Sequence, residues 1–225
     1  MSINLTEREQ SVSIPAGQVS LQGTLYIPPE PAGMVIFSHG SGSGRLSPRN
    51  RFVASKLRKL GLGTLLLDLL TEREDSDFER RFDISLLTER LGAAVRYIRN
   101  NPESNSAPIG LFGASTGAAS ALRVAADMPE DIAAVVSRGG RPDLTGCETL
   151  AAVRTPTLLI VGGNDVGVIE LNEKARRAMV NCTCEMTIVP GATHLFEESG
   201  KLEEVARLAG EWFARFMQTE LADSR

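Results

Sequence analysis

Six short apolar runs, separated by longer segments with helical spacing, constrain the fold of this 225-residue chain most strongly. The runs are Met34–Ser38, Gly63–Asp68, Pro108–Phe112, Ile132–Ser137, Thr157–Val161 and Glu185–Val189. Strands that alternate with helix-length amphipathic segments are typical of a parallel β-sheet joined by crossover helices. Because each run is apolar almost throughout, we expect these strands to be covered on both faces.

Helical periodicity is clearest in two segments between and after these runs. Apolar residues recur at Ile84, Leu87, Leu91, Val95 and Ile98, and again at Leu202, Val205, Leu208, Trp212 and Phe216. This spacing predicts two amphipathic helices whose apolar stripes pack on the sheet. Ahead of the first parallel strand, Val12–Ile14 and Val19–Ile27 alternate apolar and polar residues, which predicts an antiparallel edge of the same sheet.

The length of the chain and its 42% hydrophobic content suit a single α/β domain over residues 1–225. We find no repeat and no linker that would divide it. Gly139–Arg154 has room for at most one short helix, so we expect no separate lid domain. The charged segment Thr71–Arg81 lacks apolar periodicity, which predicts a solvated loop or, as the alternative, a segment overhanging an active-site mouth.

Composition argues against several classes of protein. A net charge of −4 provides no basic surface for nucleic acid. Met1–Gln10 lacks the apolar core of a secretory signal and no later run is long enough to span a membrane, so we expect a cytoplasmic protein. The three cysteines form neither a disulfide framework nor a metal-ligand pattern, and we expect them to be reduced. No metal or organic cofactor is expected.

The strongest chemical signal is the pentapeptide Gly113-Ala114-Ser115-Thr116-Gly117. It directly follows the apolar run Ile109–Phe112 and precedes a helix-forming stretch, Ala118–Ala126. A G-x-S-x-G sequence at a strand-to-helix turn is a nucleophile elbow, which holds its serine in strained backbone geometry and requires small neighbours. The placement carries more weight than the pentapeptide, and it predicts that Ser115 is a nucleophile.

A serine hydroxyl is a weak nucleophile until a base accepts its proton. His194, one of only two histidines, follows the last predicted strand and is expected in a loop at the carboxyl edge of the sheet. Asp165 follows the run Thr157–Val161 and is the expected partner of this histidine, with Asp68 as its rival. The chain order serine, aspartate, histidine favours Asp165.

The loop after Met34–Ser38 is rich in glycine and reads His39-Gly40-Ser41-Gly42-Ser43-Gly44. Hydrolysis through a serine needs backbone N–H groups aimed at the developing oxyanion. We expect these donors to be the N–H groups of Thr116 and Ser41, with Gly40 as the alternative to Ser41. The loop lacks the Lys-Ser/Thr of a P-loop and the spacing of a dinucleotide fingerprint, which disfavours phosphate binding.

Several residues are candidates for contact with substrate because they should lie in loops that follow strands. These are His39, Gly40, Arg45, Arg49, Arg138 and Arg141. The four arginines suggest an anionic or carboxylate-bearing substrate as a second hypothesis. Arginine is abundant in this chain, so solvated or structural roles are the competing interpretation.

Together these motifs resemble the dienelactone hydrolase-like branch of the α/β-hydrolase superfamily. The resemblance rests on His39-Gly40, the elbow around Ser115, Gly162-Gly163-Asn164-Asp165 and Gly191-Ala192-Thr193-His194. It implies the α/β-hydrolase fold, with a mostly parallel sheet of about eight strands flanked by helices on both faces, and hydrolysis through an acyl-enzyme.

Dienelactone hydrolases proper carry a cysteine nucleophile, whereas this chain has Ser115. This departure favours a carboxylesterase acting on small, soluble esters or lactones, as a monomer or homodimer. Two alternatives remain open. The same triad could serve an acyltransferase or perhydrolase, and the fold could serve a non-catalytic ligand-binding protein.

Overall fold

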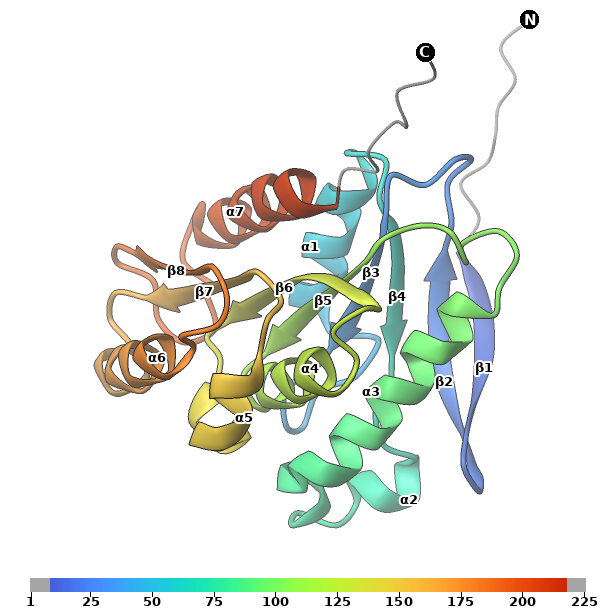
Figure 1. Ribbon diagram of the computed structural model, residues 1–225, viewed down its shortest axis with the longest axis horizontal. Helices are drawn as coiled ribbons and strands as arrows, with labels where there is room; N and C mark the ends of the chain where they lie inside the picture. The colour runs from blue at the N-terminus through green and yellow to red at the C-terminus, as the bar shows by residue number, and fades with distance from the viewer. Residues whose placement is uncertain (1–8, 218–225) are drawn as a thin grey trace, which may run out of the picture.

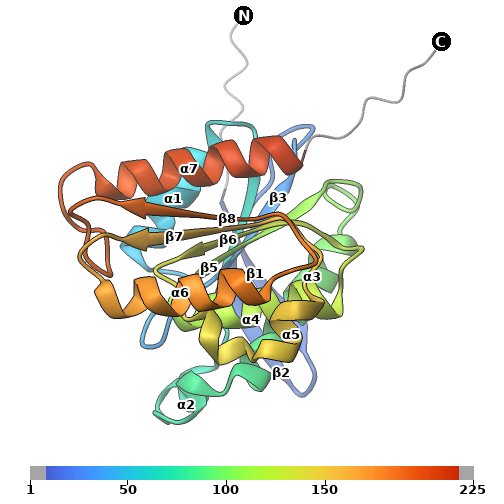
Figure 2. The same ribbon diagram turned by 60° about the vertical axis from the view of Figure 1, so that its left-hand side comes forward.

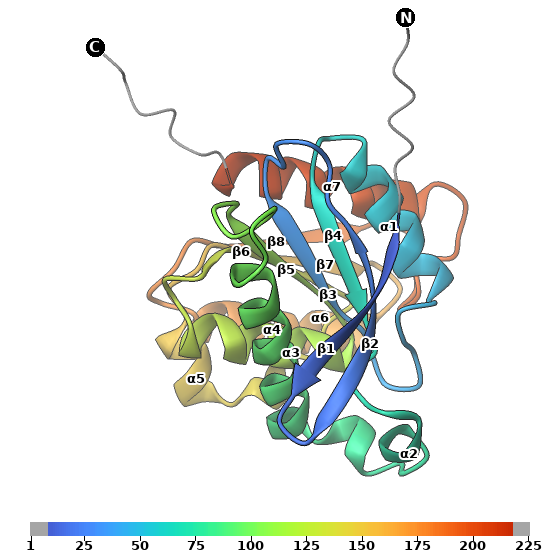
Figure 3. The ribbon, with the colours of Figure 1, turned by 90° about the vertical axis from the view of Figure 1, so that its right-hand side faces the viewer.

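All six predicted parallel strands are present in the computed structural model, which describes residues 9–217 (Figure 1). The strands are β1 (Gln10–Ala16), β2 (Val19–Tyr26), β3 (Met34–Ser38), β4 (Gly63–Leu67), β5 (Ile109–Ala114), β6 (Ile132–Arg138), β7 (Thr157–Gly162) and β8 (Cys184–Val189). They form one eight-stranded sheet in the order β1-β2-β4-β3-β5-β6-β7-β8. The predicted antiparallel edge is confirmed, since β1 and β2 form a hairpin and β2 pairs antiparallel with β4 (Figure 3).

Helices cover both faces of the sheet. They are α1 (Pro48–Arg58), α2 (Glu72–Asp75), α3 (Ile84–Arg99), α4 (Thr116–Asp127), α5 (Cys147–Ala152), α6 (Val166–Ala178) and α7 (Lys201–Phe216). Helices α1 and α7 lie on one face, and α3 to α6 lie on the other (Figure 2). The chain first steps outward from β3 to β4 and then reverses toward β8. Because crossovers are right-handed, this reversal moves the connecting helices to the opposite face.

The central strands are buried on both faces, as their apolar runs predict. Every residue of β3, β4 and β5 is buried, and one apolar cluster lies on each side of the sheet. The same prediction is wrong for β8, where most residues are partly exposed and Ile188 is 45% exposed. The reason is position, because β8 pairs only with β7 and forms the edge of the sheet.

The segment Thr71–Arg81 after β4 is mostly exposed, as predicted, but it contains a short helix and one buried side chain, Glu74, where only loop was predicted. Thr71 and Glu74 form a capping box that starts the short helix α2. Glu74 is buried and forms an ion pair with Arg90 of α3, with 3.1 Å between Oε1 and Nη2. Burial opposes the charge of Glu74, but hydrogen bonds from Thr71 and the charge of Arg90 outweigh it and lower the pKa of this carboxyl. These contacts fasten the segment to α3.

Two other predictions bear on the boundaries of the fold. Gly139–Arg154 contains a 3₁₀ turn, Pro142–Thr145, and the single short helix α5, so the described residues include no lid domain. Within residues 9–217, no helix combines the length and apolarity needed to cross a bilayer. The prediction about Met1–Gln10 falls almost entirely outside the described residues.

Candidate active site

The candidate site lies at the carboxyl edge of the sheet, where neighbouring strands β3 and β5 send their chains to opposite faces. Helix α1 follows β3 on one face, whereas α4 follows β5 on the other. Such a reversal opens a crevice between the loops, which is where ligands bind in open α/β sheets. Ser115 follows β5, and Asp165 and His194 lie in the loops after β7 and β8.

Ser115 occupies a strained turn between β5 and α4. Its backbone angles are φ 51° and ψ −121°, a region that residues with a side chain rarely adopt. A Cβ on Gly113 would lie 2.5 Å from Cα of Ala118, and one on Gly117 would overlap the carbonyl oxygen of Ser38. The two glycines are therefore required by close packing, and the turn directs the serine hydroxyl toward His194.

The structure brings three predicted side chains into a hydrogen-bonded line. His194 Nε2 lies 3.3 Å from Ser115 Oγ, and His194 Nδ1 lies 2.7 Å from Asp165 Oδ2. With Asp165 ionised, Nδ1 carries the proton and Nε2 presents its lone pair to the hydroxyl. The rival carboxylate, Asp68, instead accepts from the backbone N–H of Arg45 at 2.7 Å. It faces the glycine-rich loop His39–Gly44, the oxyanion loop.

The predicted oxyanion donors also meet beside the nucleophile. The N–H of Ser41 donates to Oγ1 of Thr116 at 2.9 Å, and a Cβ on Gly40 would lie 3.0 Å from Cβ of Ser115. A substrate oxygen would compete with the Thr116 hydroxyl for the Ser41 N–H. The hydroxyl of Thr116 accepts this bond and keeps its own proton to donate, so it is a further candidate for oxyanion binding that our sequence reasoning, restricted to backbone donors, missed. Its signal was a hydroxyl residue directly after the nucleophile.

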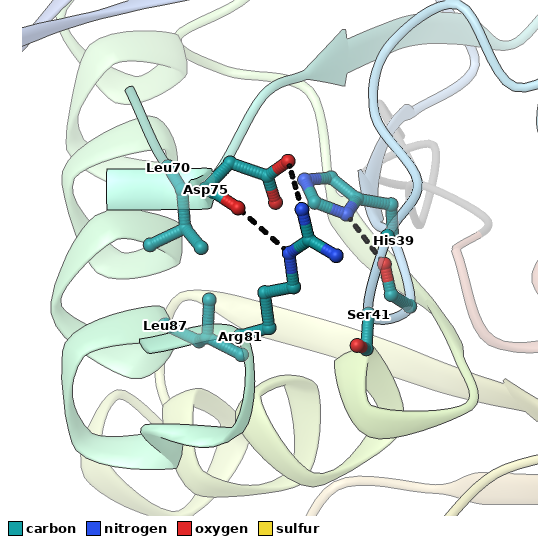
Figure 4. Close-up of a pocket in the computed structure, with 8 residues that line it drawn as sticks. His39, Ser41, Leu70, Asp75, Arg81 and Leu87 are labelled. Atoms are coloured by element: carbon teal, nitrogen blue, oxygen red, sulfur yellow. Dashed lines mark hydrogen bonds and ion pairs between the residues drawn. The ribbon is translucent and has the colours of Figure 1, made fainter. Parts of the chain in front are cut away.

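His39, predicted to contact substrate, has a different environment. It is 5% exposed, its Nδ1 donates to the carbonyl of Gly40 at 2.9 Å, and its Nε2 accepts from the N–H of Leu69 at 3.0 Å. Burial lowers the pKa of its imidazole. With both nitrogens bonded to backbone, His39 holds the oxyanion loop in place and has no nitrogen left for a substrate. Figure 4 shows Arg81 beside it, bound to Asp75.

The four candidate arginines separate into two kinds. Arg45, Arg141 and Arg49 each form an ion pair, with Asp68 at 3.3 Å, Asp143 at 2.7 Å and Glu197 at 2.5 Å. Arg138 was expected in a loop but is the last residue of β6, where it is 5% exposed. No carboxylate of the described chain forms an ion pair with it.

Comparisons with known proteins agree with this architecture. The dienelactone hydrolase family model matches residues 21–220. A crystal structure of a dienelactone hydrolase from Anabaena variabilis is 49% identical, with a TM-score of 0.90 over 94% of this chain and 99% of that one. Est1E from Butyrivibrio proteoclasticus is 17% identical with a TM-score of 0.79, covering 93% of this chain and 99% of Est1E, which shows the fold alone.

Curated relatives are longer than this chain. A Mycobacterium tuberculosis protein named "Putative phosphoribosyl transferase Rv0571c" is 52% identical over 206 residues, which are 92% of this chain but 46% of that protein. Mouse acyl-coenzyme A thioesterase 1 is 30% identical over 128 residues, covering 56% of this chain and 29% of the mouse protein. The matched parts of the chain therefore cover less than half the length of these relatives. The family match over residues 21–220 shows that the chain belongs to the dienelactone hydrolase family, within the α/β-hydrolase superfamily.

Proposed function

We propose that the protein is a serine hydrolase that cleaves carboxylic ester or lactone bonds through an acyl-enzyme on Ser115. The observation that carries this proposal is the hydrogen-bonded line from Ser115 through His194 to Asp165, with the serine on a strained elbow. A nucleophile, its base and a group that orients the base are the parts that acyl transfer requires.

In the first half of the reaction, Ser115 Oγ attacks the carbonyl carbon while its proton passes to His194 Nε2. The oxyanion that forms is bound by the N–H groups of Thr116 and Ser41. Asp165 stabilises the imidazolium through Nδ1. When the C–O bond to the alcohol breaks, His194 donates its proton to the leaving oxygen, and the acyl group remains on the serine.

In the second half, His194 accepts a proton from water, and the hydroxide attacks the acyl carbon. The second tetrahedral intermediate collapses, the bond to Ser115 Oγ breaks, and His194 returns the proton to the serine. The products are the free acid and the original enzyme. The water, the ester and these side chains supply every atom in this sequence.

The test is covalent labelling with a fluorophosphonate, with the modified residue mapped by mass spectrometry. We expect one adduct, on Ser115, and turnover of short-chain p-nitrophenyl esters. The Ser115→Ala variant should lose both while keeping the wild-type melting temperature. Labelling elsewhere, or full ester turnover by the folded variant, would overturn the assignment.

Two alternatives keep the fold and change its use. An acyltransferase or perhydrolase would pass the acyl group from Ser115 to an alcohol or to peroxide, and product analysis with these acceptors separates both from hydrolysis. A non-catalytic binding protein would leave Ser115 unlabelled while binding a small molecule. The transferase name of the mycobacterial relative belongs to a protein more than half of which lies outside the match, and the triad geometry favours chemistry on an acyl group over phosphoribosyl transfer for this chain.

A further inference from the structure

Arg138 is a buried cation without an anionic partner in the described structure. Its side chain makes one weak hydrogen bond, from Nη2 to Oδ1 of Asn50 at 3.4 Å, and its buried Nε has no acceptor. Burying a charge is expensive unless it is paired and hydrogen-bonded. The other three candidate arginines have carboxylates, so the environment of Arg138 calls for an acceptor that the chain does not provide.

The surroundings of Arg138 also contain more positive charge and more N–H donors than the nearby acceptors can pair. Arg49 pairs with Glu197 at 2.5 Å, yet its Nε is also buried without an acceptor. The guanidinium of Arg138 lies 6.0 Å from the ring of Phe196. These contacts place Arg138 between Asn50, in the first turn of α1, and the segment that follows His194, and Arg49 belongs to the same turn of α1. Two arginines and one glutamate leave one net positive charge there.

The backbone adds to the positive potential of this cluster. Helix α1 begins at Pro48 with Ser47 as its cap and has no acidic residue in its first turn. The partial positive charge of a helix N-terminus favours anions. Burial, together with repulsion from Arg49, lowers the pKa of Arg138 to about 10, so the guanidinium remains charged at neutral pH.

The cluster adjoins the reacting groups. The carbonyl of Arg138 accepts the N–H of Ser115 at 3.2 Å, and Phe196 and Glu197 lie two and three residues after His194 in sequence. We propose that Arg138, Arg49 and Asn50 form a subsite for a second anionic group, a carboxylate or a phosphate, on the substrate of Ser115. The inference rests on the proposed hydrolase function and assigns its substrate class.

The kinetic test compares esters that differ in one anionic group. On the acyl side, mono-4-nitrophenyl glutarate is matched with 4-nitrophenyl valerate. On the leaving-group side, 4-acetoxybenzoate and 4-acetoxyphenyl phosphate are matched with 4-methylphenyl acetate. We expect at least one anionic ester to show a higher kcat/KM than its neutral match, by about 10- to 100-fold. The carboxylate and phosphate arms distinguish the two anions.

Arg138→Met should abolish this ratio, whereas Arg141→Met should preserve it, because Arg141 has its own carboxylate partner. If Arg138→Met does not fold, Arg138→Lys and Arg138→Gln replace it, and the wild-type ratio still decides. A wild-type preference for every neutral ester would overturn the subsite. So would an anionic preference that a folded Arg138→Met or Arg138→Gln variant retains.

A binding measurement separates failure of the subsite from failure of the hydrolase proposal. Binding of inorganic phosphate and of glutarate is measured by calorimetry and by the shift in melting temperature. Both measurements are made on the Ser115→Ala protein, which cannot turn over substrate. We expect binding that disappears when Arg138→Met is added. If phosphate or glutarate binds but Ser115 of the wild-type protein is not labelled by the fluorophosphonate, the subsite proposal stands and the hydrolase proposal is overturned. If Ser115 is labelled but neither anion binds and no anionic ester is preferred, the subsite proposal is overturned, and water would be the acceptor of the unpaired N–H groups of Arg138 and Arg49.

Discussion

The chain has two histidines, and the regions around them differ in almost every physical respect. His39 is 5% exposed, and this burial lowers the pKa of its imidazole. Both of its ring nitrogens bond to backbone groups. The side chain of His194 is 37% exposed and bonds to a carboxylate on one side and to a serine hydroxyl on the other. Both follow strands at the same edge of one sheet.

The difference shows that the partners of an imidazole, and not its place in the fold, decide its chemistry. His39 must stay neutral, because protonation of Nε2 would remove the acceptor of the Leu69 N–H. In the proposed mechanism His194 gains and loses a proton, and its bond to Asp165 would stabilise the charged ring. We therefore expect removal of His194 to affect the rate, and removal of His39 to affect stability and the oxyanion loop.

The largest expected effect belongs to His194→Ala. Without the base, kcat for a p-nitrophenyl ester should fall by about 10⁵-fold or more, the scale at which triad histidines act. The melting temperature should change little, because the side chain is partly exposed. Steady-state kinetics and thermal unfolding measure the two. A folded variant within tenfold of the wild-type kcat would mean that another group accepts the serine proton.

Asp165→Asn tests the orienting bond. An amide leaves the geometry intact but favours the wrong tautomer of His194, and kcat should fall by about 10⁴-fold, the size of the effect known for serine proteases. Asp68→Asn is the matched comparison, since Asp68 bonds to Arg45 instead. Equal losses of kcat in the two variants would show that Asp165 has no role in orienting His194 beyond that of a neighbouring carboxylate.

The fold and the line of three side chains could be predicted because their signals are local. Apolar runs located the strands, and Gly113 and Gly117 marked a turn where a Cβ would clash with backbone. His194 and Asp165 followed from chain order, since parallel strands bring their carboxyl ends to one edge.

The environments of single side chains depend on contacts distant in sequence, and there prediction failed. The burial of Arg138 depends on α1 and on the segment after β8, which lie 88 and 58 residues away at Asn50 and Phe196. The ion pair of Glu74 with Arg90 likewise joins two elements that charge counting treats separately. Sequence pattern identified these residues as charged but could not say which of them would be paired.

His39→Leu should lower the free energy of unfolding, and its effect on kcat should be much smaller than that of His194→Ala. Loss of the acceptor for the Leu69 N–H leaves a buried donor unpaired, which costs about 1–3 kcal/mol. A loosened oxyanion loop should also lower kcat by about 10- to 100-fold. His39→Gln offers an oxygen near the position of Nε2 and should recover part of both losses. Urea unfolding and kcat are the measurements, and a Leu variant as stable as wild type would remove the anchoring role.

The lowered pKa of His39 gives stability a defined pH dependence. The unfolded imidazole titrates near its ordinary value of 6.5, and the folded one titrates below that. The contribution of neutral His39 is therefore complete above pH 6.5 and is lost as the pH falls from there through the lower folded pKa. Between pH 7.5 and 5, the free energy of unfolding should drop more in wild type than in His39→Gln. Equal drops in both proteins would place the titrating group elsewhere.

The smallest effect is expected where the segment before α3 meets the oxyanion loop. Arg81 binds the carbonyl of Asp75 at 2.8 Å and its carboxylate at 3.1 Å, but its side chain is 30% exposed. Such ion pairs contribute less than about 1 kcal/mol, so Arg81→Gln and Asp75→Asn should leave stability and kcat/KM near wild type. A loss of about tenfold in kcat/KM, equivalent to about 1.4 kcal/mol, would instead show that this segment positions the loop, because the buried anchor at His39 is intact in both variants.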